Sequence, residues 1–105
     1  IQRFYNYMLG QYGDAPARCD GRINERIVLQ HLYSPAMWSI FQLSDLLGID
    51  EKIRREDPNE ERINVPSEPH HHWNYRMHIY LEDLLEANEF NEELKKNMVA
   101  SGRNP

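Results

Sequence analysis

The stretch from Arg62 to His78 concentrates the side chains best suited to chemistry in this 105-residue sequence. It holds asparagines, a tryptophan, a tyrosine, arginines and four histidines, and it follows a strongly charged segment. Amide and guanidinium groups donate hydrogen bonds, aromatic rings offer flat apolar faces, and imidazoles bind metals. A polar, proline-broken loop between apolar elements is where a scaffold commonly carries its site. This stretch is therefore the leading candidate for a functional site.

The histidines of this stretch are His70, His71, His72 and His78. Consecutive residues point in different directions, no cysteine is near, and no H-E-x-x-H pair occurs. The pattern favours polar loop histidines, one of which could touch a substrate. We therefore expect no metal site and no other cofactor.

Asp45 is the acidic residue of most interest. It follows an apolar segment that we expect to be a strand, and barrel enzymes carry site residues at that end of their strands. Paired carboxylates can cleave glycosidic bonds, with retention when they lie about 5–5.5 Å apart. The alternative is that Asp45 caps the short helical turn that follows it. Other chemistry finds no support, because the serines lack a G-x-S-x-G elbow and no glycine-rich phosphate loop occurs.

Trp73 also has two interpretations. Its flat apolar face could stack on a sugar ring, or the side chain could anchor the loop in the core with its N–H bonded to backbone. The residue types alone leave both open.

The apolar spacing predicts a mostly helical chain around these residues. Asp20 is a plausible N-cap for the second helix, and residues 50–61 are expected to form a solvated, charged loop. Residues 37–43 have the composition of a buried strand. A lone strand cannot satisfy its own backbone groups, so its partners lie outside these residues or the segment is helical. The expected helical segments are 1–9, 22–33, 46–48, 79–86 and 91–100.

Composition excludes several classes of protein. The net charge of −5, from 12 basic and 17 acidic residues, argues against a nucleic-acid partner. No uncharged run is apolar enough to cross a bilayer, and the first residues lack the features of a signal peptide. One cysteine, Cys19, fits a reducing compartment. We expect a soluble, cytoplasmic protein without membrane contact. Because the sequence starts inside a helical pattern without an initiator methionine, we also expect a piece of a longer protein.

Four ordered motifs resemble the C-terminal end of the amylomaltases, which are 4-α-glucanotransferases of glycoside hydrolase family 77. The family pattern is a strand ending in Leu-Gln-Asp-Leu-Leu-Gly, then Arg-x-Asn-x-Pro-Gly, then Asn-Trp-x-(Tyr/Trp)-Arg. The matches span roughly residues 31–85. The matching motifs are Ser34-Pro35-Ala36-Met37, Ile40-Phe41-Gln42-Leu43-Ser44-Asp45-Leu46-Leu47-Gly48, Arg62-Ile63-Asn64-Val65-Pro66 and Trp73-x-Tyr75-Arg76.

The resemblance implies a fold and an activity. Residues 1–105 would form a single, mostly α fragment, the C-terminal part of a (β/α)8 TIM-type barrel with at most one or two short strands, the last at about 38–43. The complete enzyme would transfer α-1,4-glucan segments between maltooligosaccharides with retention. The family's catalytic carboxylates lie upstream of the matched motifs, so no catalytic residue is assigned here and the fragment is expected to be inactive.

The resemblance also implies roles within residues 62–76, here called the 62–76 loop. Asn64 would hydrogen-bond glucosyl hydroxyls, Pro66 would fix the loop, and Trp73 would complete the substrate-binding set. Arg62 and Arg76 would support the loop. Asp45 would support the site from the end of the strand.

Three departures bear on acceptor preference: Ser44, Ser67 and His72 replace the Gln, Gly and Asn of the family pattern. The charged insert is also longer than in compact members. In this it resembles the insert of large members that carry starch-binding modules.

The alternative function is a small helical interaction module whose aromatic loop binds protein. A truncated barrel would instead expose apolar surface near residues 38–41, so we expect the fragment to self-associate.

Overall fold

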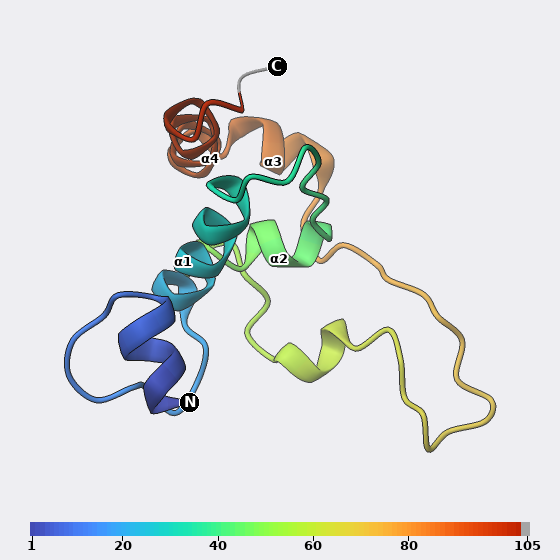
Figure 1. Cartoon of the computed structure of the whole chain (residues 1–105). Coiled ribbons are helices and arrows are strands. Elements are labelled where there is room, and N and C mark those ends of the chain that lie inside the picture. Colours follow the sequence, from blue (N-terminus) through green and yellow to red (C-terminus); the bar gives the residue numbers. More distant parts are fainter. Residues whose placement is uncertain (104–105) are drawn as a thin grey trace.

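The computed structural model describes residues 1–103 and is helical, with no β-strand among them. Two long helices, α1 (Gly21–Leu32) and α4 (Asn88–Ala100), lie with the short helices α2 (Leu43–Leu47) and α3 (Leu81–Glu86) in one body (Figure 1). A π-helical turn at Phe4–Met8 and a 3-10 turn at Pro58–Glu61 complete the elements. The mostly α prediction is confirmed.

Helix α1 forms where the sequence predicts it. The Asp20 side chain accepts a hydrogen bond from the Ile23 N–H at 2.9 Å, which satisfies one of the free donors of the first turn. The apolar stripe buries Val28 and Leu32, and Pro35 follows shortly after the helix ends. The expected N-cap is therefore confirmed.

The core lies where α1 meets α2 and α4. Leu47 of α2 is completely buried, and the other buried hydrophobic residues are Leu9, Val28, Leu32 and Phe90. Asn24 of α1 packs closely on Gly48. A Cβ atom added to Gly48 would lie only 2.8 Å from the side-chain amide nitrogen of Asn24. Glycine at this helix end thus permits the close approach of α1 and α2.

The predicted strand at residues 37–43 is wrong. Met37, Trp38 and Ile40 lie in an exposed segment without regular structure, and Leu43 already begins α2. The described residues provide no neighbouring strand, so the backbone of this segment has no ladder to join. Trp38 and Ile40 remain at the surface instead, whereas Phe41 is half-buried.

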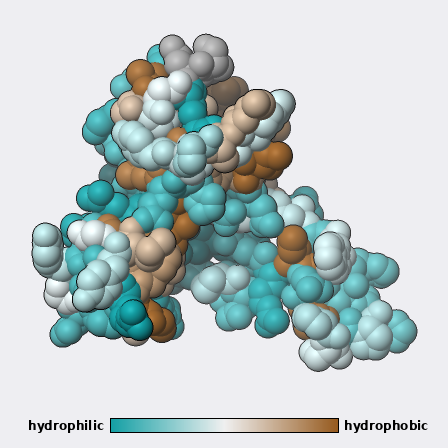
Figure 2. Space-filling view, viewed as in Figure 1, coloured by the Kyte–Doolittle hydropathy of each residue, from teal (hydrophilic) through white to brown (hydrophobic). Residues whose placement is uncertain are grey.

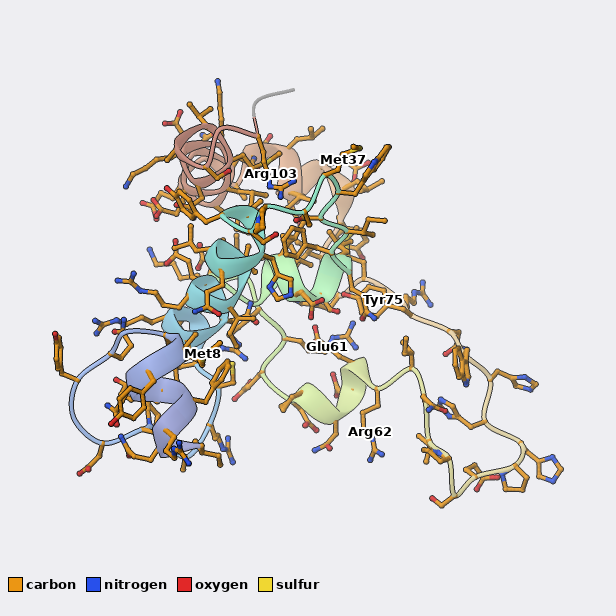
Figure 3. The ribbon with its side chains drawn as sticks, viewed as in Figure 1. Met8, Met37, Glu61, Arg62, Tyr75 and Arg103 are labelled. Atoms are coloured by element: carbon orange, nitrogen blue, oxygen red, sulfur yellow. The ribbon has the colours of Figure 1, made fainter. Side chains whose placement is uncertain are left out.

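The C-terminal helices differ slightly from the prediction. Helix α4 begins at Asn88 rather than near residue 91. Only Ala87 separates it from α3. Arg103, just beyond α4, reaches back to the turn after α1, as Figure 3 shows beside Met37. Its guanidinium donates to the carbonyl oxygens of Leu32 at 2.5 Å, Ser34 at 3.0 Å and Ala36 at 2.6 Å. These bonds fasten the C-terminal end to α1.

The molecule is more open than an ordinary domain of its size. Its radius of gyration is 15.4 Å, against about 13 Å for a compact chain of this length. Its accessible surface is 8593 Å², against about 6,200 Å² for a folded monomer of this mass. The segment between the 3-10 turn and α3 accounts for part of the difference, because it extends away from the helices (Figure 1).

Within residues 1–103, no helix has the length and apolarity needed to cross a membrane.

Candidate functional site

The 62–76 loop is shaped by two successive proline turns. The Glu68 N–H donates to the Val65 carbonyl at 3.0 Å, and the His71 N–H donates to the Glu68 carbonyl at 3.2 Å. Pro66 and Pro69 each take the second position of their turn, where the fixed φ of proline is favoured. Both turns lie at the tip of the loop. The reversal of the chain there is therefore set by the backbone preferences of the proline residues rather than by packing against the helices.

Histidines fasten the loop to itself and to the preceding segment. The His71 Nε2 lies 3.1 Å from the Ile63 carbonyl oxygen, which joins the two sides of the loop. The His78 Nε2 lies 2.6 Å from the Ile53 carbonyl oxygen. In both cases the ring nitrogen must donate, because a carbonyl oxygen only accepts. These imidazoles therefore act as hydrogen-bond donors to backbone. Within residues 1–103, no group of three or more His, Cys, Asp or Glu residues could hold a metal ion.

The three predicted substrate-binding residues present exposed side chains. Asn64 and Pro66 are exposed, and Trp73 is 74% exposed. The interpretation of Trp73 as a core anchor is therefore wrong for this structure, and its ring is free to meet a ligand. The surface around these residues is mainly hydrophilic, with isolated hydrophobic side chains (Figure 2).

Asp45 does not sit where the strand prediction placed it. It lies in the first turn of α2, whose N-cap is Gln42, so the alternative role as helix cap is also wrong. Its carbonyl oxygen accepts a hydrogen bond from the Asn24 side chain at 2.5 Å, and its carboxylate is exposed. A carboxylate in a first turn interacts favourably with the helix dipole. Among the described residues, no hydrogen bond or ion pair joins Asp45 to the 62–76 loop.

Arg62 and Arg76 lie at opposite ends of the loop with exposed side chains. The Arg62 N–H closes the 3-10 turn by donating to the Asn59 carbonyl at 3.3 Å. The Arg76 carbonyl accepts from Arg55 at 2.5 Å. Both residues thus make backbone hydrogen bonds at the ends of the loop, and within residues 1–103 no hydrogen bond or ion pair involves their guanidinium groups.

Arg55 is the residue that the sequence did not reveal. It belongs to the charged run expected to be solvated, yet its side chain is only 14% exposed. It donates to the Glu60 carbonyl at 3.1 Å as well as to Arg76, and its guanidinium carbon lies 5.9 Å from the centre of the Tyr75 ring. Two of its partners are backbone carbonyls, which leave no trace in residue type.

Energetic magnitudes show why such contacts matter. Closing a flexible loop of about 16 residues costs about 2.5 kcal/mol of chain entropy plus a constant. A hydrogen bond to a charged group contributes about 1.5–3 kcal/mol. The two bonds from Arg55 are therefore of the size needed to offset the closure of the loop.

Tyr75 completes the base of the loop. Burial raises the pKa of its phenol above the usual value, the Glu61 carboxylate raises it further, and the Arg55 guanidinium partly opposes them. Figure 3 shows Glu61 and Tyr75 near each other where the two sides of the loop meet. The phenol therefore stays neutral at neutral pH.

Comparison with known proteins places these features in a family. Residues 1–82, which include the whole 62–76 loop, match the family described as 4-alpha-glucanotransferase. The chain belongs to the 4-alpha-glucanotransferase family. It is also 38% identical over 101 residues to the 4-alpha-glucanotransferase DPE2 of Oryza sativa subsp. japonica. That match covers 96% of this chain and 11% of the rice protein, so the chain spans about a tenth of that relative's length. No solved structure matches.

The extent of the 4-alpha-glucanotransferase match goes beyond the motifs. The motifs lie within about residues 31–85, whereas the family match reaches back to residue 1 and so includes α1. Helix α4 lies beyond residue 82. The part of the chain that carries the 62–76 loop and the core residue Leu47 is thus common to the family.

Proposed function

We propose that this chain is part of a retaining 4-alpha-glucanotransferase and that the 62–76 loop lines the acceptor side of its glucan cleft. The observation that carries the proposal is the loop itself. Within family-matched residues, the loop carries the exposed Asn64 amide and the Trp73 indole, 74% exposed, on either side of its two proline turns. An amide both donates and accepts hydrogen bonds, as sugar hydroxyls do, and an indole offers the flat apolar face that a sugar ring stacks on.

The proposed context of the site is a (β/α)8-type barrel completed by the rest of a longer polypeptide. In that setting the α-1,4-glucan is transferred through a glycosyl-enzyme intermediate by carboxylates on the other part of the barrel. Asp45, Arg62 and Arg76 are proposed to support the loop without touching the reacting atoms. Cytoplasmic location is also part of the proposal, since the exposed free thiol of Cys19 suits a reducing compartment.

The proposed contact of Asn64 can be tested in the complete enzyme. Asn64→Ala is expected to lower kcat/KM for glucan transfer, because glucosyl hydroxyls lose their partner. The decrease should correspond to a loss of about 1–3 kcal/mol of transition-state stabilisation. Asn74→Ala is the matched control, since Asn74 is an exposed asparagine in the same loop whose side chain makes no hydrogen bond within residues 1–103. Equal kcat/KM values for the two variants would contradict the contact role of Asn64.

The exposed apolar side chains around Trp38 predict self-association of the isolated chain. Trp38 and Met37 border a groove of about 500 Å³, and Figure 2 shows hydrophobic side chains reaching the surface in that part of the molecule. We propose that the remainder of the enzyme covers this surface, and that a second copy covers it when the chain is alone. Other residues lining the groove are Val28, Leu32, Phe41, Leu46, Leu94 and Met98.

Sedimentation velocity of the isolated chain checks this expectation. The wild-type chain should show concentration-dependent association, and Ile40→Asp should shift the distribution toward monomer. Ile1→Asp is a suitable control, because Ile1 is similarly exposed but lies at the N-terminus and does not line the groove (Figure 1). A monomer at every concentration for the wild-type chain would refute the prediction.

A further inference from the structure

The two ends of the 62–76 loop meet at one guanidinium group. Arg55 Nη1 donates to the Glu60 carbonyl oxygen at 3.1 Å, and Arg55 Nη2 donates to the Arg76 carbonyl oxygen at 2.5 Å. The Glu60 carboxylate adds an ion pair at 3.8 Å. One accepting carbonyl precedes the loop and the other ends it, so a single side chain bridges the loop's base.

The surroundings of Arg55 fix this geometry. The Tyr75 ring lies 5.9 Å from the guanidinium carbon, within the range of a cation–π contact. The Nε atom is buried and has no hydrogen-bond partner among residues 1–103. The guanidinium is planar and presents its donors in a rigid fork, so its two Nη atoms can bond the two carbonyls at the same time. A lysine ammonium at this position has no such fork.

A second contact supports the same segment as an anchor. His78 lies just after the loop, and its Nε2 meets the carbonyl oxygen of Ile53, two residues before Arg55. The loop itself contains no helix or strand, and its proline turns shape only the tip. Contacts to residues 53–55 are therefore what the structure offers to hold the loop against the body.

We propose that Arg55 is the positioning residue that closes the base of the 62–76 loop and so sets where Asn64 and Trp73 lie. Arg55 does not touch the substrate in this proposal. It acts through the backbone of Glu60 and Arg76. The consequence for glucan transfer rests on the proposed function, whereas the closure of the loop does not.

Hydrogen exchange measured by mass spectrometry on the complete enzyme tests the closure. Arg55→Gln should accelerate exchange roughly 5- to 30-fold in peptides covering residues 58–77, the range expected when one or two hydrogen bonds are lost. Exchange in α1 and α4 should stay unchanged. The matched control is Arg54→Gln, because Arg54 is similarly buried, at 24% exposure, but pairs with Glu51 outside the loop.

Tyr75 supplies a second pair of variants that leaves Arg55 in place. Tyr75→Ala should loosen the loop in the same peptides, since the guanidinium loses the ring that covers it. Tyr75→Phe keeps the ring and should exchange as the wild type does. If Arg55→Gln disrupts folding, this pair decides the proposal. Equal exchange in Tyr75→Ala and Tyr75→Phe would then overturn it.

Transfer kinetics of the same variants separate the two claims. If the loop also binds acceptor, Arg55→Gln should raise the KM for acceptor about tenfold, and Arg55→Lys should recover only part of the loss. Faster loop exchange with an unchanged KM supports closure by Arg55 and counts against the proposed role of the loop. Unchanged loop exchange in Arg55→Gln overturns the proposal, whatever the kinetics show.

Discussion

The isolated 105-residue chain is expected to show no glucan transfer. A retaining mechanism needs two carboxylates held about 5–5.5 Å apart across the scissile bond. The resemblance places the family's catalytic carboxylates upstream of the motifs matched here. Asp45 lies in the first turn of α2, and among the described residues no hydrogen bond or ion pair joins it to the 62–76 loop. Incubation with maltotriose and separation of the products by chromatography measures this directly. The complete enzyme, assayed in parallel, is the positive control.

Any transfer product formed by the isolated chain would refute this expectation. A contaminating enzyme is excluded by repeating the assay with Asn64→Ala, which should change the rate only if the chain itself is active.

Replacing Leu47 with alanine is expected to destabilise the fold by about 2–5 kcal/mol, the range for a leucine removed from a packed core. Leu47 is completely buried, and few other hydrophobic residues share its core. Small domains have only about 5–15 kcal/mol of stability. With this small core the chain is expected near the lower end of that range. The variant should therefore retain no more than about 3 kcal/mol of stability, which a urea titration followed by circular dichroism would show as a clearly lower midpoint.

Leu85→Ala is the matched control for this experiment. Leu85 is also a helical leucine, but it is 78% exposed, so its removal should change stability by no more than about 0.5 kcal/mol. Similar urea midpoints for the two variants would contradict the placement of the core between α1 and α2.

The helices could be predicted because their signals are local. Asp20 caps α1 by accepting a hydrogen bond from the N–H of a residue three positions later. The apolar stripe of α1 that contains Val28 and Leu32 is visible in the sequence at helical spacing. Proline turns at Pro66 and Pro69 follow from backbone restriction at single residues. The family motifs located the 62–76 loop, because they depend on residue types in order.

The errors arose where structure depends on distant groups. Residues 37–43 have a strand composition, but a strand needs partners, and the described residues offer none. Trp73 fitted both a buried and an exposed role, because an indole suits either environment. Arg55 could not be found, since its hydrogen bonds go to carbonyls 5 and 21 residues away. Carbonyls are present at every residue, so no pattern of side chains marks the partners of an arginine.

The structure of the complete enzyme with a bound maltooligosaccharide tests the central claim most directly. The 62–76 loop should lie along the glucan, with the Asn64 amide within hydrogen-bonding distance of a glucosyl hydroxyl and the Trp73 ring against the apolar face of a sugar. A glucan that fills the cleft without touching any residue of the loop would contradict the account.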